Sequence, residues 1–515
     1  MKKSPPKQGG TVSSTLRIAK APFDAQTADV LFVSSDGVQF YVIKAILAMA
    51  SPLFSDTFPL TQPPMASSSG SLRNAFEVPE DSSTLDHLLR LCYPISDPEI
   101  TDVRTAGQVL EAALKYQMSE ATTLSTKILR TFVHSHPLDV YAIACTLGLE
   151  PEAKMAASAW RSSRMFTEDG PFNMTVAGAG YIPAMAKIRA GSYFRLMQFG
   201  RGGQDAEQSF CAPTRGSPLL PIGTSAPSPT FVASSLVAPR ELYRDGADVI
   251  LRSSDGVDFP AHTLILRAAS AEGLLRISDS EVRTHGQIPI IPVDTSSFIL
   301  APLLKLCYPF YGGQRYAENL LTTCAIVRVA IKYQMRQAVT YLRDELTSLI
   351  PTNPLAVFFL AIELGWTATA QECCKHVVAL DIESTYVPEM ENAYAEDYYK
   401  LLQYRHECEE LAFRVVAKHA PLIPHRSSSV QLALREALHS SVGALSLVIV
   451  DQELRKPSQW SSSYGGGSPI TRSLDTPSLL IDSARFRAEL QASVSAVSHT
   501  LAQRSYRCRA DVRDQ

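Results

Sequence analysis

The sequence has almost no excess charge of either sign. Its 48 lysines and arginines stand against 51 aspartates and glutamates, which leaves a formal net charge of −3. Proteins that bind nucleic acids need clustered basic residues to neutralise phosphates. We therefore predict no nucleic-acid partner.

Long apolar segments are also missing. The nearest candidate, residues 442–450, is far shorter than the roughly 20 residues that a membrane-spanning helix requires. The basic, proline-rich start of the chain is not followed by the apolar stretch of a signal peptide. We therefore predict no membrane partner.

The cysteines show no disulfide framework. There are nine of them, an odd number, and their spacing is irregular. This predicts buried thiols in a reducing compartment, the cytoplasm or the nucleus. Cys373, Cys374, His376, His406 and Cys408 together resemble a metal site, but adjacent cysteines lack the Cys-x₂₋₄-Cys spacing that chelates one ion. We predict no metal.

Catalytic motifs are absent as well. The sequence contains no phosphate-binding loop with its lysine, no Gly-x-Ser-x-Gly and no His-Glu-x-x-His. The glycine run at 465–467 lies in Ser-rich sequence that is typical of a linker. We predict neither an enzyme nor a bound cofactor.

What the chain does contain is one long segment twice. The copies lie at a nearly constant separation, which indicates a duplicated domain and not an array of short repeats. The most similar pieces are residues 28–40 and 247–259, residues 89–94 and 304–309, and residues 115–118 and 332–335.

Each copy begins with alternating apolar residues on either side of Ser-Ser-Asp-Gly. Asp-Gly between such segments predicts a β-hairpin with a type I′ turn, because both residues tolerate positive φ. Helices are then expected over 43–54 and 262–275, short strands over 76–79 and 288–293, and helices over 83–92 and 297–307 that end at Tyr-Pro.

Further helices complete each copy. Asn353 is expected to cap a helix that begins at Pro354 and ends at Gly365, with Gly148 ending its counterpart. Residues 201–240 between the copies are rich in Gly, Ser and Pro, which predicts a flexible linker. A Ser-rich tail follows the second copy and includes a helix-like stretch at 485–501.

The Asp-Gly hairpin, Leu-Cys-Tyr-Pro and Lys-Tyr-Gln-Met together resemble a BTB/POZ domain. The helix that begins Pro-Leu-x-Val-(Tyr/Phe) resembles the BACK-like extension that follows many fungal BTB domains. The resemblance implies an α+β protein with two tandem BTB/POZ-like domains, each a short mixed sheet covered by helices with a C-terminal helical extension. The expected ranges are a disordered N-terminus 1–22, domain 23–132, extension 133–200, linker 201–240, domain 241–350, extension 351–425 and tail 426–515.

The resemblance also implies a function: a non-enzymatic module for protein–protein interaction, a dimerisation domain or a scaffold. Helices near the start of such domains form the dimer face, so self-association is expected, either within one chain or between two. The alternative is a substrate adaptor that binds a cullin scaffold of a ubiquitin ligase, although no Kelch or similar substrate-binding domain follows. A transcription co-regulator is a weaker third choice, because nothing in the sequence would contact DNA.

Four residues are candidates for the interaction or dimer pocket. In zinc-finger relatives an Asp at the first strand and an Arg after the hairpin form a charged pocket. These positions correspond to Asp29 and Lys44 in the first copy, and to Asp248 and Thr263 in the second, where His262 keeps the preceding Ala-His of the family. The two copies therefore present unequal surfaces.

A structural role for these residues is favoured over partner recognition. Each aspartate is expected to satisfy backbone donors near the start of its strand, and His262 to be a half-buried residue at a helix entry.

Overall fold

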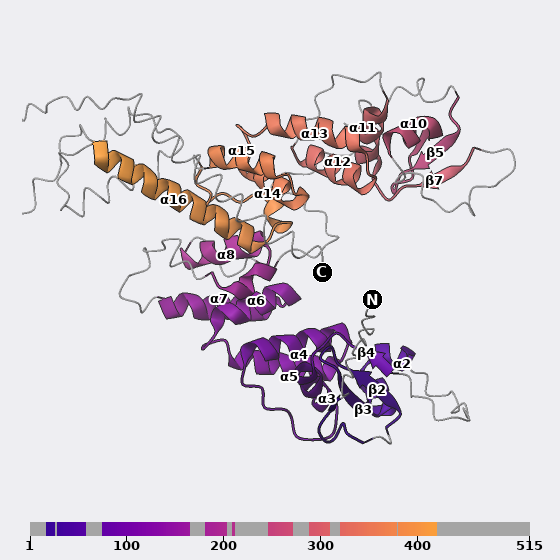
Figure 1. The fold of residues 1–515 in the computed structure, drawn as a ribbon, viewed down its shortest axis with the longest axis vertical. Coiled ribbons are helices and arrows are strands. Elements are labelled where there is room, and N and C mark those ends of the chain that lie inside the picture. Colours follow the sequence, from indigo (N-terminus) through magenta and orange to yellow (C-terminus); the bar gives the residue numbers. More distant parts are fainter. Residues whose placement is uncertain are drawn as a thin grey trace, which may run out of the picture. The chain divides into compact units, whose positions relative to one another are not determined.

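The computed structural model describes residues 17–25, 28–57, 75–164, 181–202, 209–211, 246–270, 288–308, 320–377 and 380–419. The chain divides into two compact units (Figure 1). The first comprises Met1–Ile188 and Ser192–Thr214, and the second comprises Arg189–Gly191 and Arg215–Gln515. Among the described residues, no helix has the length and apolar character needed to cross a bilayer. The predicted tail and its helix at 485–501 lie outside the described residues.

The first unit begins with a four-stranded mixed sheet. Its strands are β1 (Arg17–Ile18), β2 (Val30–Val33), β3 (Val38–Val42) and β4 (Ala75–Glu77), in the order β1-β3-β2-β4. The β2–β3 pair is antiparallel, whereas β1 and β4 join as parallel edge strands. Alternate residues of β3 are buried, which is the period-two pattern of a sheet with one face on the core.

The N-terminal range predicted as disordered contains an ordered part. β1 pairs with β3, the Arg17 guanidinium donates to the Asp36 carbonyl at 2.9 Å, and the ring of Phe23 is fully buried. The prediction was wrong here because a strand of two residues is too short to show the alternating pattern by which a strand is found in a sequence.

The hairpin turn also differs from the expected type I′. Gly37 has φ +79°, but the non-glycine residues with positive φ in the described chain are Gln117 and Gln334. Asp36 therefore lacks the positive φ that a type I′ turn needs at both central residues. The loop is longer by one residue and closes with the Gly37 amide donating to the Ser34 carbonyl at 2.9 Å.

Two short helices replace the single helix expected over 43–54. α1 (Lys44–Ala50) ends at Ser51, which is extended, and α2 (Pro52–Thr57) begins at the next residue. The break arises because the residue before a proline disfavours the helical conformation. The buried Ser51 hydroxyl then donates to the Tyr116 carbonyl at 2.5 Å and accepts from the Phe54 amide at 3.2 Å.

Three longer helices pack beside β2 and β3 (Figure 1): α3 (Ser82–Arg90), α4 (Val103–Lys115) and α5 (Ser119–Thr131). At the end of α4, Gln117 has φ 54° and the Met118 amide donates to the Ala113 carbonyl at 2.9 Å. This is a Schellman-type helix end. It explains why Lys-Tyr-Gln-Met is repeated in the sequence.

A helical extension follows. It consists of α6 (Pro137–Leu147), α7 (Glu150–Arg164), the 3₁₀ helix η2 (Pro183–Lys187) and α8 (Ala190–Gly200). As expected, Gly148 ends α6 in the left-handed conformation, with φ 73°.

The second unit repeats this order of elements. The sheet is β6-β5-β7, and the last helix is the long α16 (Ala395–His419). The other elements are β5 (Val249–Arg252), β6 (Asp258–Ala261), α10 (Thr263–Ala269), β7 (Ile290–Pro292), α11 (Ser297–Cys307), α12 (Leu320–Lys332), α13 (Arg336–Ser348), α14 (Pro354–Leu364), α15 (Thr367–Val377) and the 3₁₀ helix η4 (Pro388–Glu391).

The repetition extends to single bonds. The Ser270 hydroxyl donates to the Tyr333 carbonyl at 2.6 Å, Gln334 has φ 55°, and Gly365 ends α14 with φ 73°. Asn353 does precede α14, but its side chain makes no capping bond and donates to the Thr352 hydroxyl instead. Its expected capping role was therefore wrong.

Leu47 is on the inner side of α1 with its side chain fully buried, whereas Met49 on the same helix is 89% exposed. We expect Leu47→Ala to destabilise the first unit by about 2 to 5 kcal/mol, because it leaves a cavity in a packed core. Met49→Ala, the matched control, should change stability by less than about 0.5 kcal/mol. Amide hydrogen exchange in α4 measures both, and equal effects would contradict this account of how α1 is held.

Candidate interaction surface

Asp29 and Asp248 hold the starts of two equivalent helices. A carboxylate oxygen of Asp29 accepts from the Lys44 backbone amide at 2.7 Å, and one of Asp248 accepts from the Thr263 amide at 2.6 Å. Lys44 and Thr263 are the first residues of α1 and α10, where unpaired amides and the helix dipole favour a negative charge. This geometry is that of a cap.

The pKa of Asp248 follows from this bond. Partial burial raises the pKa, but the hydrogen bonds from Thr263 outweigh it and hold the pKa below its usual value. A carboxyl group with a lowered folded-state pKa stabilises the fold above its unfolded-state pKa, and this contribution is lost as the pH falls through the lowered value.

His262 and its counterpart Ile43 both sit beside a tyrosine of the repeated Leu-Cys-Tyr-Pro. The Tyr93 hydroxyl accepts from the Ile43 amide at 2.8 Å, and the Tyr308 hydroxyl accepts from the His262 amide at 3.3 Å. The His262 ring adds a contact of 3.1 Å from Nδ1 to the same hydroxyl. The backbone frame is thus shared, while an exposed apolar side chain in one unit is replaced by a half-buried imidazole in the other.

The aspartates of the two Asp-Gly turns do more than turn the chain. Asp36 accepts from the Ser82 amide and hydroxyl, both at 2.8 Å, and so fixes the start of α3. Asp255 accepts from the Ser297 amide at 2.8 Å and from its hydroxyl at 2.5 Å. Bonds from Ser253 and Ser297 lower the pKa of Asp255 to about 2. The sequence predicts only a turn at these aspartates; their presence in both copies was the available clue to the second role.

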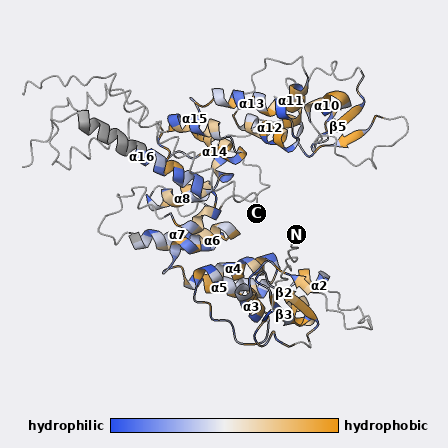
Figure 2. Cartoon of the chain, viewed as in Figure 1, coloured by the Kyte–Doolittle hydropathy of each residue, from blue (hydrophilic) through white to orange (hydrophobic). Residues whose placement is uncertain are grey.

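The outward side of α1 is apolar. Met49 is 89% exposed, Ile43 at the helix entry is 45% exposed, and Ala45 lies one turn before Met49. Leu53 on α2 is 37% exposed. We call these four residues the α1 face. Figure 2 colours the strands β2 and β3 largely as hydrophobic, whereas α4 and α5 alternate between hydrophobic and hydrophilic stretches.

α10 has a corresponding apolar face, but its large exposed residue lies one helical turn earlier than the one in α1. Leu264 is 80% exposed and Ala268 is exposed, at the positions of Ala45 and Met49 in the first copy. Our sequence interpretation missed both faces. The clue was that neither short helix has enough polar residues to cover its solvent side.

The cysteine–histidine cluster does not assemble into a metal site within the described residues, where no group of three or more potential ligands converges. Cys373 and Cys374 are buried in α15, and burial raises the pKa of Cys373. The Cys408 side chain lies outside the described residues.

Comparison with protein families identifies residues 20–132 as a BTB/POZ domain. Neither the curated proteins nor the solved structures gave a significant match. The prediction of a BTB/POZ domain in the first half of the chain is therefore confirmed. Domains of this family mediate protein–protein interaction and self-association and are usually not enzymes.

Replacing Asp29 separates capping from partner recognition. We expect Asp29→Ala to cost about 1 kcal/mol of stability by removing the cap of α1, and to leave self-association unchanged. Hydrogen exchange of the α1 amides measures the first, and light scattering the second. Asp24→Ala, at an exposed aspartate five residues earlier, is the control. Loss of self-association without loss of stability would show that Asp29 contacts a partner.

Proposed function

We propose that the chain is a non-enzymatic interaction protein that self-associates through the α1 face and its counterpart on α10. The observation that carries this proposal is the 89% exposure of Met49 on α1. Both ends of this helix are held by hydrogen bonds to the domain, and its inner side is buried through Leu47. A large apolar side chain so exposed adds stability only when another surface covers it. A cytoplasmic or nuclear location is part of the proposal.

We further propose that the second unit contains a second BTB/POZ-like domain. Three features support it: strand registers that match pair for pair, the same left-handed glutamine at the end of a helix, and the same serine–carbonyl bond after the first helix. Exposed Leu264 then gives this domain an interaction face of its own. The helices that follow each domain are proposed to be BACK-like extensions of the fungal type.

Substitution of Met49 tests self-association. We expect Met49→Glu to lower the concentration-dependent mass seen by light scattering to that of one chain, because a carboxylate would be buried without a partner. Met155→Glu is the matched control, since Met155 is an exposed methionine on α7, outside both faces. Equal behaviour of the two variants would contradict the proposal for pairing between chains.

A one-chain mass for the wild type would point to pairing within the chain, which the predicted linker would favour by raising the effective concentration. In that case, a short bismaleimide should join Met49→Cys to Leu264→Cys within one chain, as read by peptide mass spectrometry. The two single cysteine variants are the controls. Failure of both the mass change and the crosslink would refute self-association through these faces.

Recruitment to a cullin scaffold stays an alternative that comes from the family resemblance. Co-purification of a cullin with the full chain would support it, and loss of that cullin in Met49→Glu would show that it needs an intact α1 face. No measurable cullin binding by the full chain would remove this alternative. A role as a transcription co-regulator likewise stays a prediction.

A further inference from the structure

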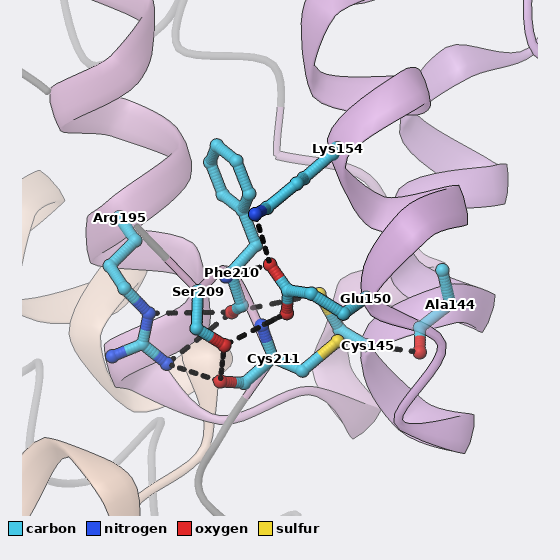
Figure 3. Close-up of polar contacts among 8 residues, drawn as sticks. All are labelled: Ala144, Cys145, Glu150, Lys154, Arg195, Ser209, Phe210 and Cys211. Atoms are coloured by element: carbon cyan, nitrogen blue, oxygen red, sulfur yellow. Dashed lines mark hydrogen bonds and ion pairs between the residues drawn. The ribbon is translucent and has the colours of Figure 1, made fainter. Parts of the chain in front are cut away.

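The extension of the first unit holds a short piece of its own chain through the main chain of that piece. Residues 209–211, Ser-Phe-Cys, form neither helix nor strand. The Glu150 carboxylate accepts from the Phe210 amide at 2.7 Å and from the Cys211 amide at 2.9 Å (Figure 3). It also accepts from the Ser209 hydroxyl at 2.9 Å. One carboxylate therefore satisfies two successive backbone donors and a flanking hydroxyl.

Arg195 on α8 completes the contacts from the other side. Its guanidinium donates to the Phe210 carbonyl and to the Cys211 carbonyl, each at 3.3 Å. The polar main-chain groups of both residues are thus satisfied by two charged side chains in place of a strand or helix. We call Glu150 and Arg195 the main-chain clamp.

Phe210 adds an apolar anchor. Its ring is 2% exposed and meets Tyr141 of α6 edge-on at 5.9 Å between ring centres and Phe199 of α8 at 5.3 Å. Such edge-to-face pairs are a favourable aromatic geometry. Main-chain bonds combined with a buried aromatic anchor are the means by which proteins recognise extended peptides.

The clamp is charged under ordinary conditions. Burial opposes ionisation of Glu150, but the bonds from Cys211, Phe210 and Ser209 outweigh burial and hold its pKa below the usual value. The Lys154 ammonium lies 4.0 Å from the same carboxylate. Contact with the Cys145 thiol and burial raise the pKa of Cys211, which keeps it a neutral thiol that packs against the Ala144 carbonyl at 3.8 Å.

We propose that the clamp is a peptide-binding site that the chain occupies with its own residues 209–211. Its ligands are extended peptides with a central aromatic residue between small residues, and a partner protein with such a segment competes with the internal one. The wild-type site is filled because a tethered segment has an effective concentration on the order of millimolar. The proposal is independent of self-association through the α1 face.

The second unit lacks this chemistry at the equivalent positions. Thr367 stands where the first unit has Glu150, and Lys400 stands where it has Arg195. Lys400 is paired with Glu396 at 2.6 Å, one turn earlier on its own helix. The helices are therefore repeated in the second unit, but of the two equivalent sites only the one in the first unit has the clamp.

A labelled peptide tests the site directly. The probe is a fluorescein-labelled peptide of residues 206–213 in which Ser replaces Cys211. We expect saturable binding, by fluorescence anisotropy, to the full chain carrying Phe210→Ala, and binding at least about tenfold weaker to the wild-type chain, where the internal segment competes. The same peptide with Ala in place of Phe should not bind either protein.

Further variants show where the peptide binds. Adding Glu150→Gln to the Phe210→Ala chain should weaken binding about tenfold or more, since it removes a charged acceptor shared by two amides. Met155→Ala in the same background, on the exposed side of α7, should leave it unchanged. No binding by a Phe210→Ala chain whose circular dichroism matches wild type, or equal binding of the Phe and Ala peptides, would overturn the proposal.

A second measurement does not depend on the folding of a variant. Unlabelled peptide in millimolar excess over the wild-type chain should speed hydrogen exchange at the Phe210 and Cys211 amides, because it displaces them from Glu150. Exchange in α4 serves as the internal control and should not change. Unchanged exchange at both amides in saturating peptide would show that residues 209–211 are a fixed part of the fold.

Discussion

The arrangement of the first domain depends on how the short helix α1 is fixed. At its end, the buried Ser51 hydroxyl donates to the Tyr116 carbonyl. At its start, Asp29 accepts from the Lys44 amide, and between them Leu47 fills the core. A helix of seven residues has little stability of its own, so these three contacts must supply what helix propensity cannot. Because both ends and the inner side of α1 contact the domain, only its outward side is available to a partner.

The second unit keeps this frame and changes what faces outward. Ser270, Asp248 and Leu266 make the equivalent contacts. The large exposed residue moves by one turn, from Met49 to Leu264, and a residue at a helix entry changes from Ile43 to His262. Substitution of a buried hydrogen-bonding group costs more than substitution on the surface. After duplication, the outward residues were therefore free to diverge while the frame was not.

Much of this frame could be predicted from the sequence, because period-two and helical patterns, glycine helix ends and the duplication itself are local signals. The helix ends at Gly148 and Gly365 followed from the need for positive φ. What could not be predicted depends on contacts between distant residues. The Asp36 carboxylate fixes a helix that begins 46 residues later, and the turn type followed from a loop one residue longer than assumed. The exposed α1 face was missed for the same reason, since exposure is decided by what packs on the opposite side.

The two helical extensions likewise share their backbone arrangement and differ in the side chains that could bind a ligand. Both end their first helix at a left-handed glycine. Both also have a buried aromatic residue at the same position of that helix, Tyr141 in the first extension and Phe358 in the second. Only the first combines Glu150 with Arg195, whose charges would be costly at this partly buried site without groups to bond. The backbone of residues 209–211 supplies those groups, two donors and two acceptors. Two charged side chains that bind the main chain of one short segment fit our proposal of a peptide-binding site, because an apolar contact would suffice for packing alone.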